Sequence, residues 1–100
     1  MTTIYCITEW NDKMQQVGCE YFMSLNGVVN NLTAKNAIDN KFTVRDIEIA
    51  GDYDITVENI RNVFEACERN NMAASFTINQ DFGFYAVETR YTLSTINVND

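Results

Sequence analysis

The chain has 100 residues, 46% of them hydrophobic and 21% charged, which indicates one compact domain over residues 1–100 rather than a disordered segment. Fourteen acidic and seven basic residues give a net charge of −7 at pH 7, and histidine is absent. Without histidine, Ser-His-Asp and Cys-His catalytic groups are excluded, and three scattered cysteines cannot supply a four-thiolate zinc site. The charge argues against direct binding of nucleic acid or of an anionic membrane and favours a partner with a basic surface, unless it serves only solubility.

We expect neither a secretory signal nor a membrane-spanning segment. Residues 1–10 lack the positive region and the long apolar run of a secretory signal, and no stretch approaches the roughly 18 apolar residues that span a bilayer. The odd number of cysteines suits free thiols in a reducing compartment. We therefore expect a cytoplasmic protein.

The first predicted element is a β-hairpin. Alternating side chains predict strands over residues 2–10 and 14–23, joined by a turn. If the turn is a two-residue loop, Cys6 faces Cys19 directly, either as a redox-sensitive clip or, as we favour, as two small buried hydrophobes. This register gathers apolar side chains on one face, which we expect to be buried: Ile4, Cys6, Thr8 and Trp10 with Val17, Cys19 and Tyr21.

The next segment, residues 24–40, has two readings. Its apolar residues follow the i, i+3, i+4, i+7 spacing of a helix over residues 25–32, whereas Asn26-Gly27 is a hairpin-turn signal, so residues 24–32 fit either a helix or a hairpin arm. We favour a helix, with a restart at Thr33 as an option, because the apolar residues beyond the glycine do not alternate. A strand over residues 41–50 follows and ends at Gly51.

The clearest helix is predicted over residues 57–70, with Thr56 as its N-cap and Glu58 in its first turn. A second hairpin follows, with strands over residues 73–79 and 84–93, and the polar residues 95–100 are free to fray. The predicted order is β-β-α-β-α-β-β. This order indicates an α+β domain, in which a mainly antiparallel sheet of four to five strands carries two helices on one face.

An acidic run without any intervening lysine or arginine is the most distinctive polar feature. It is not an EF-hand, because counting from Asp52 places Val57 and Val63 where Gly and Glu are required. Alternate carboxylates on a strand lie about 6–7 Å apart, a spacing comparable to that of nucleic-acid phosphates, so the run can mimic DNA toward a basic groove. The alternative is a solvated sheet edge that discourages strand pairing. The predicted partner-binding residues are Asp46, Glu48, Asp52, Tyr53, Asp54 and Glu58.

Catalysis has no sequence support. Phosphate-loop, dinucleotide-binding and nucleophile-elbow motifs are missing from the sequence, and nothing places Asp52 and Asp54 in a pocket. We therefore expect a protein that is not an enzyme and has no cofactor and no metal site. Four aromatics fall on outward or loop positions, where exposed aromatic rings next to acids form a protein-binding patch unless the strand faces are assigned wrongly: Tyr5, Phe22, Tyr53 and Phe82.

The chain is small and acidic, contains thirteen asparagines and has no proline. In these respects the chain resembles the general type of phage-encoded inhibitor proteins, such as anti-CRISPR and anti-restriction proteins. The resemblance is one of composition and carries no residue roles. It implies an inhibitor that occludes a basic, for example nucleic-acid-binding, surface of a host protein. The alternative is a self-associating structural or assembly subunit, and a homodimer is compatible with both.

Overall fold

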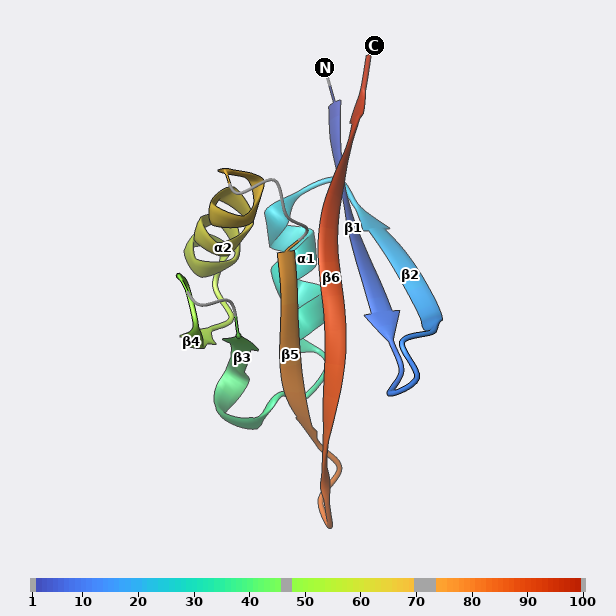
Figure 1. The fold of residues 1–100 in the computed structure, drawn as a ribbon, viewed down its shortest axis with the longest axis vertical. Coiled ribbons are helices and arrows are strands. Elements are labelled where there is room, and N and C mark those ends of the chain that lie inside the picture. The colour runs from blue at the N-terminus through green and yellow to red at the C-terminus, as the bar shows by residue number, and fades with distance from the viewer. Residues whose placement is uncertain (1, 46–47, 70–73, 100) are drawn as a thin grey trace.

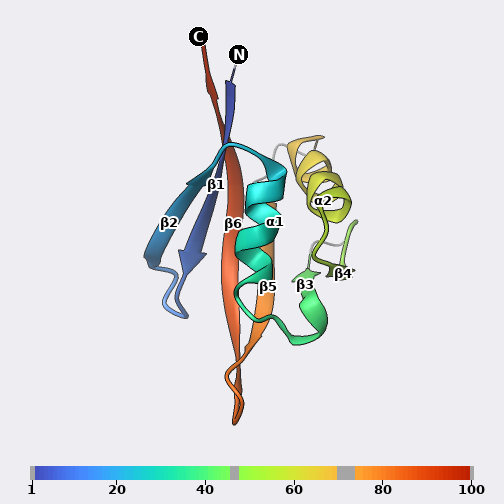
Figure 2. The ribbon, with the colours of Figure 1, turned by 180° about the vertical axis from the view of Figure 1, so that it is seen from behind.

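The computed structural model describes residues 2–45, 48–69 and 74–99. One six-stranded antiparallel sheet has the strand order β2-β1-β6-β5-β3-β4, and both α-helices pack against the same face of it (Figure 1, Figure 2). The predicted α+β class with a mainly antiparallel sheet is confirmed, although the sheet has six strands rather than four to five. The elements in chain order are β1 (Thr2–Trp10), β2 (Gln16–Phe22), α1 (Leu25–Thr33), a short 3-10 helix η1 (Ile38–Asn40), β3 (Lys41–Val44), β4 (Gly51–Asp54), α2 (Val57–Arg69), β5 (Ala74–Asp81) and β6 (Ala86–Val98).

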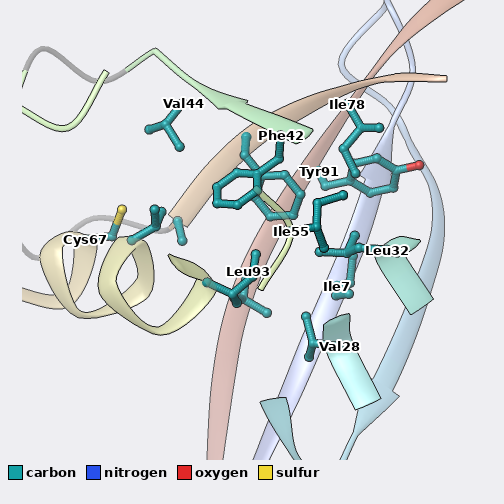
Figure 3. Packing of buried hydrophobic residues seen from close by; sticks show 14 residues of the cluster. Ile7, Val28, Leu32, Phe42, Val44, Ile55, Cys67, Ile78, Tyr91 and Leu93 are labelled. Atoms are coloured by element: carbon teal, nitrogen blue, oxygen red, sulfur yellow. The ribbon is translucent and has the colours of Figure 1, made fainter. Parts of the chain in front are cut away.

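The core lies between the two helices and the face of the sheet that they cover, here called the helix face. Val28 and Leu32 of α1 are fully buried beside Ile7 of β1 (Figure 3). Helix α2 adds a second apolar stripe that includes Ile60 and Val63. Each such side chain contributes about 1.5–3 kcal/mol when it is fully removed from water, so this layer is the main source of stability. The opposite face of the sheet, the open face, carries neither helix.

The central pair of strands joins the two ends of the chain. Strand β6 runs antiparallel to β1 from Trp10↔Arg90 to Thr2↔Val98, and the two termini lie side by side (Figure 1). Residues 95–98, which the sequence leaves free to fray, are therefore the last part of β6. Pairing strands that lie about 80 residues apart closes a long loop, which no local pattern in the sequence specifies.

The helices cover the face of β1 opposite to the predicted one, although Cys6 on the other face is buried as predicted. Tyr5 and Ile7 lie on the helix face, where Tyr5 meets Phe64 of α2 edge-on with ring centroids 6.3 Å apart. Trp10 and the other even-numbered residues of β1 lie on the open face. Both sets of alternating residues are partly apolar, so alternation alone cannot select a face. Phe22, also predicted to point outward, packs against the core as well.

The β1–β2 register differs from the predicted one by two residues. Cys6 pairs with Tyr21, and Cys19 pairs with Thr8, so the two cysteines are diagonal rather than directly opposed, and both are free thiols. The reason is a longer loop. The side-chain oxygen of Asn11 accepts hydrogen bonds from the backbone N–H groups of Lys13 at 3.0 Å and of Gln15 at 2.9 Å, which holds a wide turn in place of the expected two-residue loop.

Residues 25–33 form the helix α1 rather than a hairpin arm, and this helix is capped by the Ser24 hydroxyl, which accepts from the N–H of Gly27 at 3.1 Å. The sequence predicts one strand over residues 41–50. In the structure β3 ends at Val44, and the next strand runs antiparallel to it. Gly51, expected to end a strand, instead begins β4. Helix α2 is confirmed, and the Thr56 hydroxyl accepts from the N–H of Asn59 at 3.1 Å as predicted for an N-cap.

Candidate binding surfaces

The acidic residues predicted to bind a partner lie around β4, which is the last strand on one side of the sheet. Glu48 precedes this strand and Glu58 lies in the first turn of α2, and both are exposed. Asp52 and Asp54 are also exposed and share one side of β4 because they alternate. Asp46 lies outside the described residues. The structure thus brings four of the predicted carboxylates to one end of the sheet, and we call Glu48, Asp52, Asp54 and Glu58 the acidic edge.

Asp52 and Asp54 interact with side chains of the neighbouring strand. Asp52 accepts a hydrogen bond from the Thr43 hydroxyl at 2.7 Å, and Asp54 forms an ion pair with the Lys41 ammonium at 2.7 Å. The hydrogen bond that Lys41 donates to Asp54, together with the negative charge of Asp54, raises the pKa of Lys41. The acidic edge is therefore less negative than its sequence implies, because Lys41 on β3 stands beside it.

Tyr53 is not an exposed anchor. Its ring stacks on that of Phe42 with centroids 5.6 Å apart, and its hydroxyl donates to the backbone carbonyl of Ile49 at 2.7 Å. Tyr53 is partly buried and packs against the core. On β4 it alternates with Asp52 and Asp54, so the geometry that exposes the two acids turns the tyrosine inward.

The most exposed of the described aromatic residues, Phe84, lies instead with two other aromatics at the tip of the β5–β6 hairpin, which projects beyond the rest of the sheet (Figure 1). Phe84 is fully exposed, and Phe82 and Tyr85 are each more than half exposed. The rings of Phe82 and Tyr85 stack with centroids 5.5 Å apart. Gly83, with a backbone φ of 91°, makes the turn, and its N–H donates to the Asp81 carboxylate at 2.8 Å. We call Phe82, Phe84 and Tyr85 the aromatic tip.

The base of this hairpin is braced by the loop that follows α1. The side-chain amide of Asn36 donates to the backbone carbonyl of Asp81 at 2.8 Å. The backbone carbonyl of Asn36 accepts from the N–H of Asp81 at 3.0 Å. A β-bridge between Ala37 and Gln80 adds a further link. The hairpin is therefore held in place up to Asp81, and the aromatic tip extends from a fixed support.

A second feature is a concavity of about 400 Å³ on the open face. Four strands and the β1–β2 loop line it, with Trp10 and Met14 on one side, Thr43 and Arg45 on the other, and Arg90 between them. The sequence does not predict this concavity, because the residues that line it come from segments far apart in the chain. The only signal available there was the single tryptophan at the end of a strand.

A polar cluster also lies between the end of α1 and the sheet. The Tyr91 hydroxyl donates to Glu9 at 3.3 Å, and the Lys35 ammonium lies 5.2 Å from the centre of the Tyr91 ring. The same ammonium is 4.0 Å from the carboxylate of Glu20. Burial, followed by the charge of Glu9, raises the pKa of Tyr91 well above its ordinary value, so the phenol remains protonated. These contacts brace α1 against the sheet.

Comparison with known proteins gave no match to a family model, to a curated protein or to a solved structure. Across residues 2–45, 48–69 and 74–99, neither helix has the length and apolar character required to cross a membrane. Over the same residues, no three thiol or carboxylate side chains gather closely enough to hold a metal ion. The surfaces described above are therefore the basis on which a function can be argued.

Proposed function

We propose that this protein acts by binding another protein and that the aromatic tip anchors the contact. The observation that carries the proposal is the exposure of three large aromatic side chains on a braced, projecting hairpin. Aromatic residues dominate the energy of protein interfaces, and a rigid support lowers the entropy lost on binding. Covering these rings with a partner would remove apolar surface from water at about 25 cal/mol per Å².

The partner in this proposal has a basic surface, as nucleic-acid-binding proteins do. The net charge of −7 and the exposed carboxylates of Glu48, Asp52, Asp54 and Glu58 support it. Because Asp52 and Asp54 already have partners within the chain, we assign these acids to steering and orientation of the complex rather than to a desolvated anchor. Binding would then be faster at low salt than at high salt.

The consequence of binding in this proposal is inhibition. A chain of this size seated on a basic surface would occlude it from nucleic acid, as anti-CRISPR and anti-restriction proteins of phages do to their targets. Composition supports this part of the proposal, and the exposed position of the acidic edge is compatible with it. We propose no catalytic role, since Asp52 and Asp54 lie on an exposed strand at the sheet edge rather than in a cavity. The odd number of cysteines in the sequence favours a reducing compartment, and we propose the cytoplasm as its location.

The test compares three tagged proteins in a pull-down from the lysate of the source or host cell: the wild type, Phe84→Ser and Ile96→Ser. Ile96 is a matched control because it is an exposed apolar residue on β6, the strand that follows the tip, and lies near the opposite end of that strand. We expect a stoichiometric protein that the wild type and Ile96→Ser retain and that elutes at high salt. Its affinity for Phe84→Ser, measured with the purified partner, should fall at least tenfold, since interface anchors cost about 2 kcal/mol or more. Equal affinity for both variants would show that the tip is not the anchor.

A second candidate function, a self-associating assembly subunit, is favoured by the strand at the other end of the sheet. Strand β2 has one neighbour, β1, and Val17 and Tyr21 on it are exposed. An apolar edge strand is a template for pairing with another copy of the chain. Light scattering during gel filtration over a tenfold dilution distinguishes the two candidates. A persistent oligomer that Tyr21→Lys dissociates would favour assembly, whereas a monomer at all concentrations would exclude it.

A further inference from the structure

The concavity on the open face contains an arginine, Arg90, to which none of the residues that the structure describes supplies an acidic partner. Arg90 Nε donates to the Ser75 hydroxyl at 3.4 Å, and Nη1 lies 3.3 Å from the sulfur of Met14. Both partners are neutral, and no described carboxylate lies within ion-pair distance of Arg90. A guanidinium has five N–H donors in a planar fork that matches a carboxylate, so Arg90 retains donors for a further acceptor.

The neighbouring arginine is already neutralised. Arg45 Nη2 forms an ion pair with the carboxylate of Glu88 at 2.8 Å. Arg45 and Glu88 line the same concavity as Arg90, and so does the carboxylate of Asp12. Because Arg45 and Glu88 neutralise each other, the remaining charges are those of Arg90 and Asp12. One available positive charge beside one carboxylate suits a monoanion better than a dianion such as a phosphate monoester, whose second charge Asp12 would repel.

The concavity also offers an apolar surface next to this charge. Trp10 pairs with Arg90 across β1 and β6, and the indole N–H of Trp10 donates to the Thr92 hydroxyl at 3.0 Å, which fixes the ring. Met14 lines the concavity beside it. A fixed indole and a thioether are suited to pack against an aromatic or aliphatic group. The volume of about 400 Å³ is within the range of about 300–1,000 Å³ that small-ligand sites occupy.

We propose that this concavity binds a monocarboxylate that carries an aromatic group, with Arg90 as the partner of the carboxylate and Trp10 as the surface for the ring. The carboxylate can belong to a free small molecule or to the C-terminal residue of a peptide, and both present the same chemistry. This site shares no lining residue with the aromatic tip or the acidic edge, although Thr43 on its wall donates to Asp52 of that edge, and it does not depend on the proposed function.

The experiment uses the fluorescence of Trp10 to report binding, because Trp10 is the single tryptophan in the chain. The probes are N-acetylphenylalanine, its amide N-acetylphenylalaninamide, and a six-residue peptide that ends in phenylalanine with a free carboxylate. We expect the two carboxylates to change Trp10 fluorescence saturably and the amide to bind at least tenfold more weakly. Tighter binding of the peptide than of N-acetylphenylalanine would point to a peptide terminus, and the reverse order would point to a free small molecule.

The matched variants are Arg90→Gln and Arg61→Gln, which each remove one exposed arginine charge, the first inside the concavity and the second on α2. Arg90→Gln should weaken N-acetylphenylalanine binding at least tenfold, and Arg61→Gln should change it less than twofold. Should Arg90→Gln fail to fold, Arg90→Lys keeps the charge without the planar fork and is expected to bind with an intermediate affinity. Equal binding of the acid and the amide, or no saturable response to either carboxylate up to millimolar concentrations, would overturn the proposal.

Discussion

Tyr91 is the largest of the fully buried side chains, and its hydroxyl still reaches the carboxylate of Glu9. Desolvation, strengthened by the negative charge of Glu9, raises the pKa of this phenol in the folded chain. In the unfolded chain the phenol would ionise at its ordinary pKa of about 10. A raised folded pKa contributes stability that is fully present below pH 10 and is lost as the pH rises above it.

We therefore expect the free energy of unfolding to decrease as the pH rises above 10, with a limiting slope of about 1.4 kcal/mol per pH unit for this one group. Urea denaturation at pH 8 and at pH 11 measures the effect. In Tyr91→Phe the pH dependence should be flatter by that amount. Tyr85→Phe is the control, because Tyr85 is exposed at the aromatic tip. A dependence that both variants retain in full would assign the effect to another group.

At the same scale, Tyr53 explains why site prediction from the sequence was incomplete. Because its neighbours Asp52 and Asp54 are acidic, the sequence predicts that Tyr53 is exposed. Alternation along β4 nevertheless sends the middle residue to the other face, where Phe42 lies. The sequence indicates part of the aromatic tip, because it places Phe82 on an outward or loop position. It predicts Phe84 inside a strand and therefore does not reveal that this side chain is fully exposed.

At the scale of elements, the β1–β2 hairpin depends on one loop residue. The Asn11 side chain accepts from the N–H groups of Lys13 and Gln15 and donates to the side chain of Gln15 at 3.0 Å. We expect Asn11→Ala to lower the free energy of unfolding by about 1–2 kcal/mol, because hydrogen bonds that hold the turn are lost together.

Chemical denaturation of Asn11→Ala checks this prediction against Asp12→Ala, an exposed change in the same loop that should cost less than about 0.5 kcal/mol. Similar stability of the two variants would mean that strand pairing alone sets the register. The two-residue difference between the predicted and observed registers has the same origin. The predicted register assumes the shortest loop, whereas the Asn11 side chain stabilises a longer one.

At the scale of the whole molecule, the pairing of β1 with β6 joins the two ends of the chain. Truncation after Ser94 removes residues 95–98, which pair with β1. It also leaves Tyr5 without its cross-strand neighbour on β6. Cross-strand pairs contribute about 0.2–1 kcal/mol each, so this truncation should lower the free energy of unfolding by more than about 1 kcal/mol. Removing only residues 99–100 is the control and should change little. Thermal unfolding of both truncated chains decides whether the last strand is integral to the sheet.

Local signals in the sequence determined the elements that depend on neighbouring residues. The helix α2 with its Thr56 cap, the turn at Gly83 and the α+β class follow from caps, periodicity and turn chemistry, which act over about four residues. The exclusion of histidine-based catalysis follows from composition.

Only the tertiary structure decided which face of β1 is buried, how the two ends pair and what surrounds Arg90. The physical reason is that an alternating strand has two partly apolar faces, and the helices that cover one of them lie elsewhere in the chain. The concavity requires Trp10, Thr43 and Arg90 to meet across four strands, which happens only after the long loop between β1 and β6 is closed.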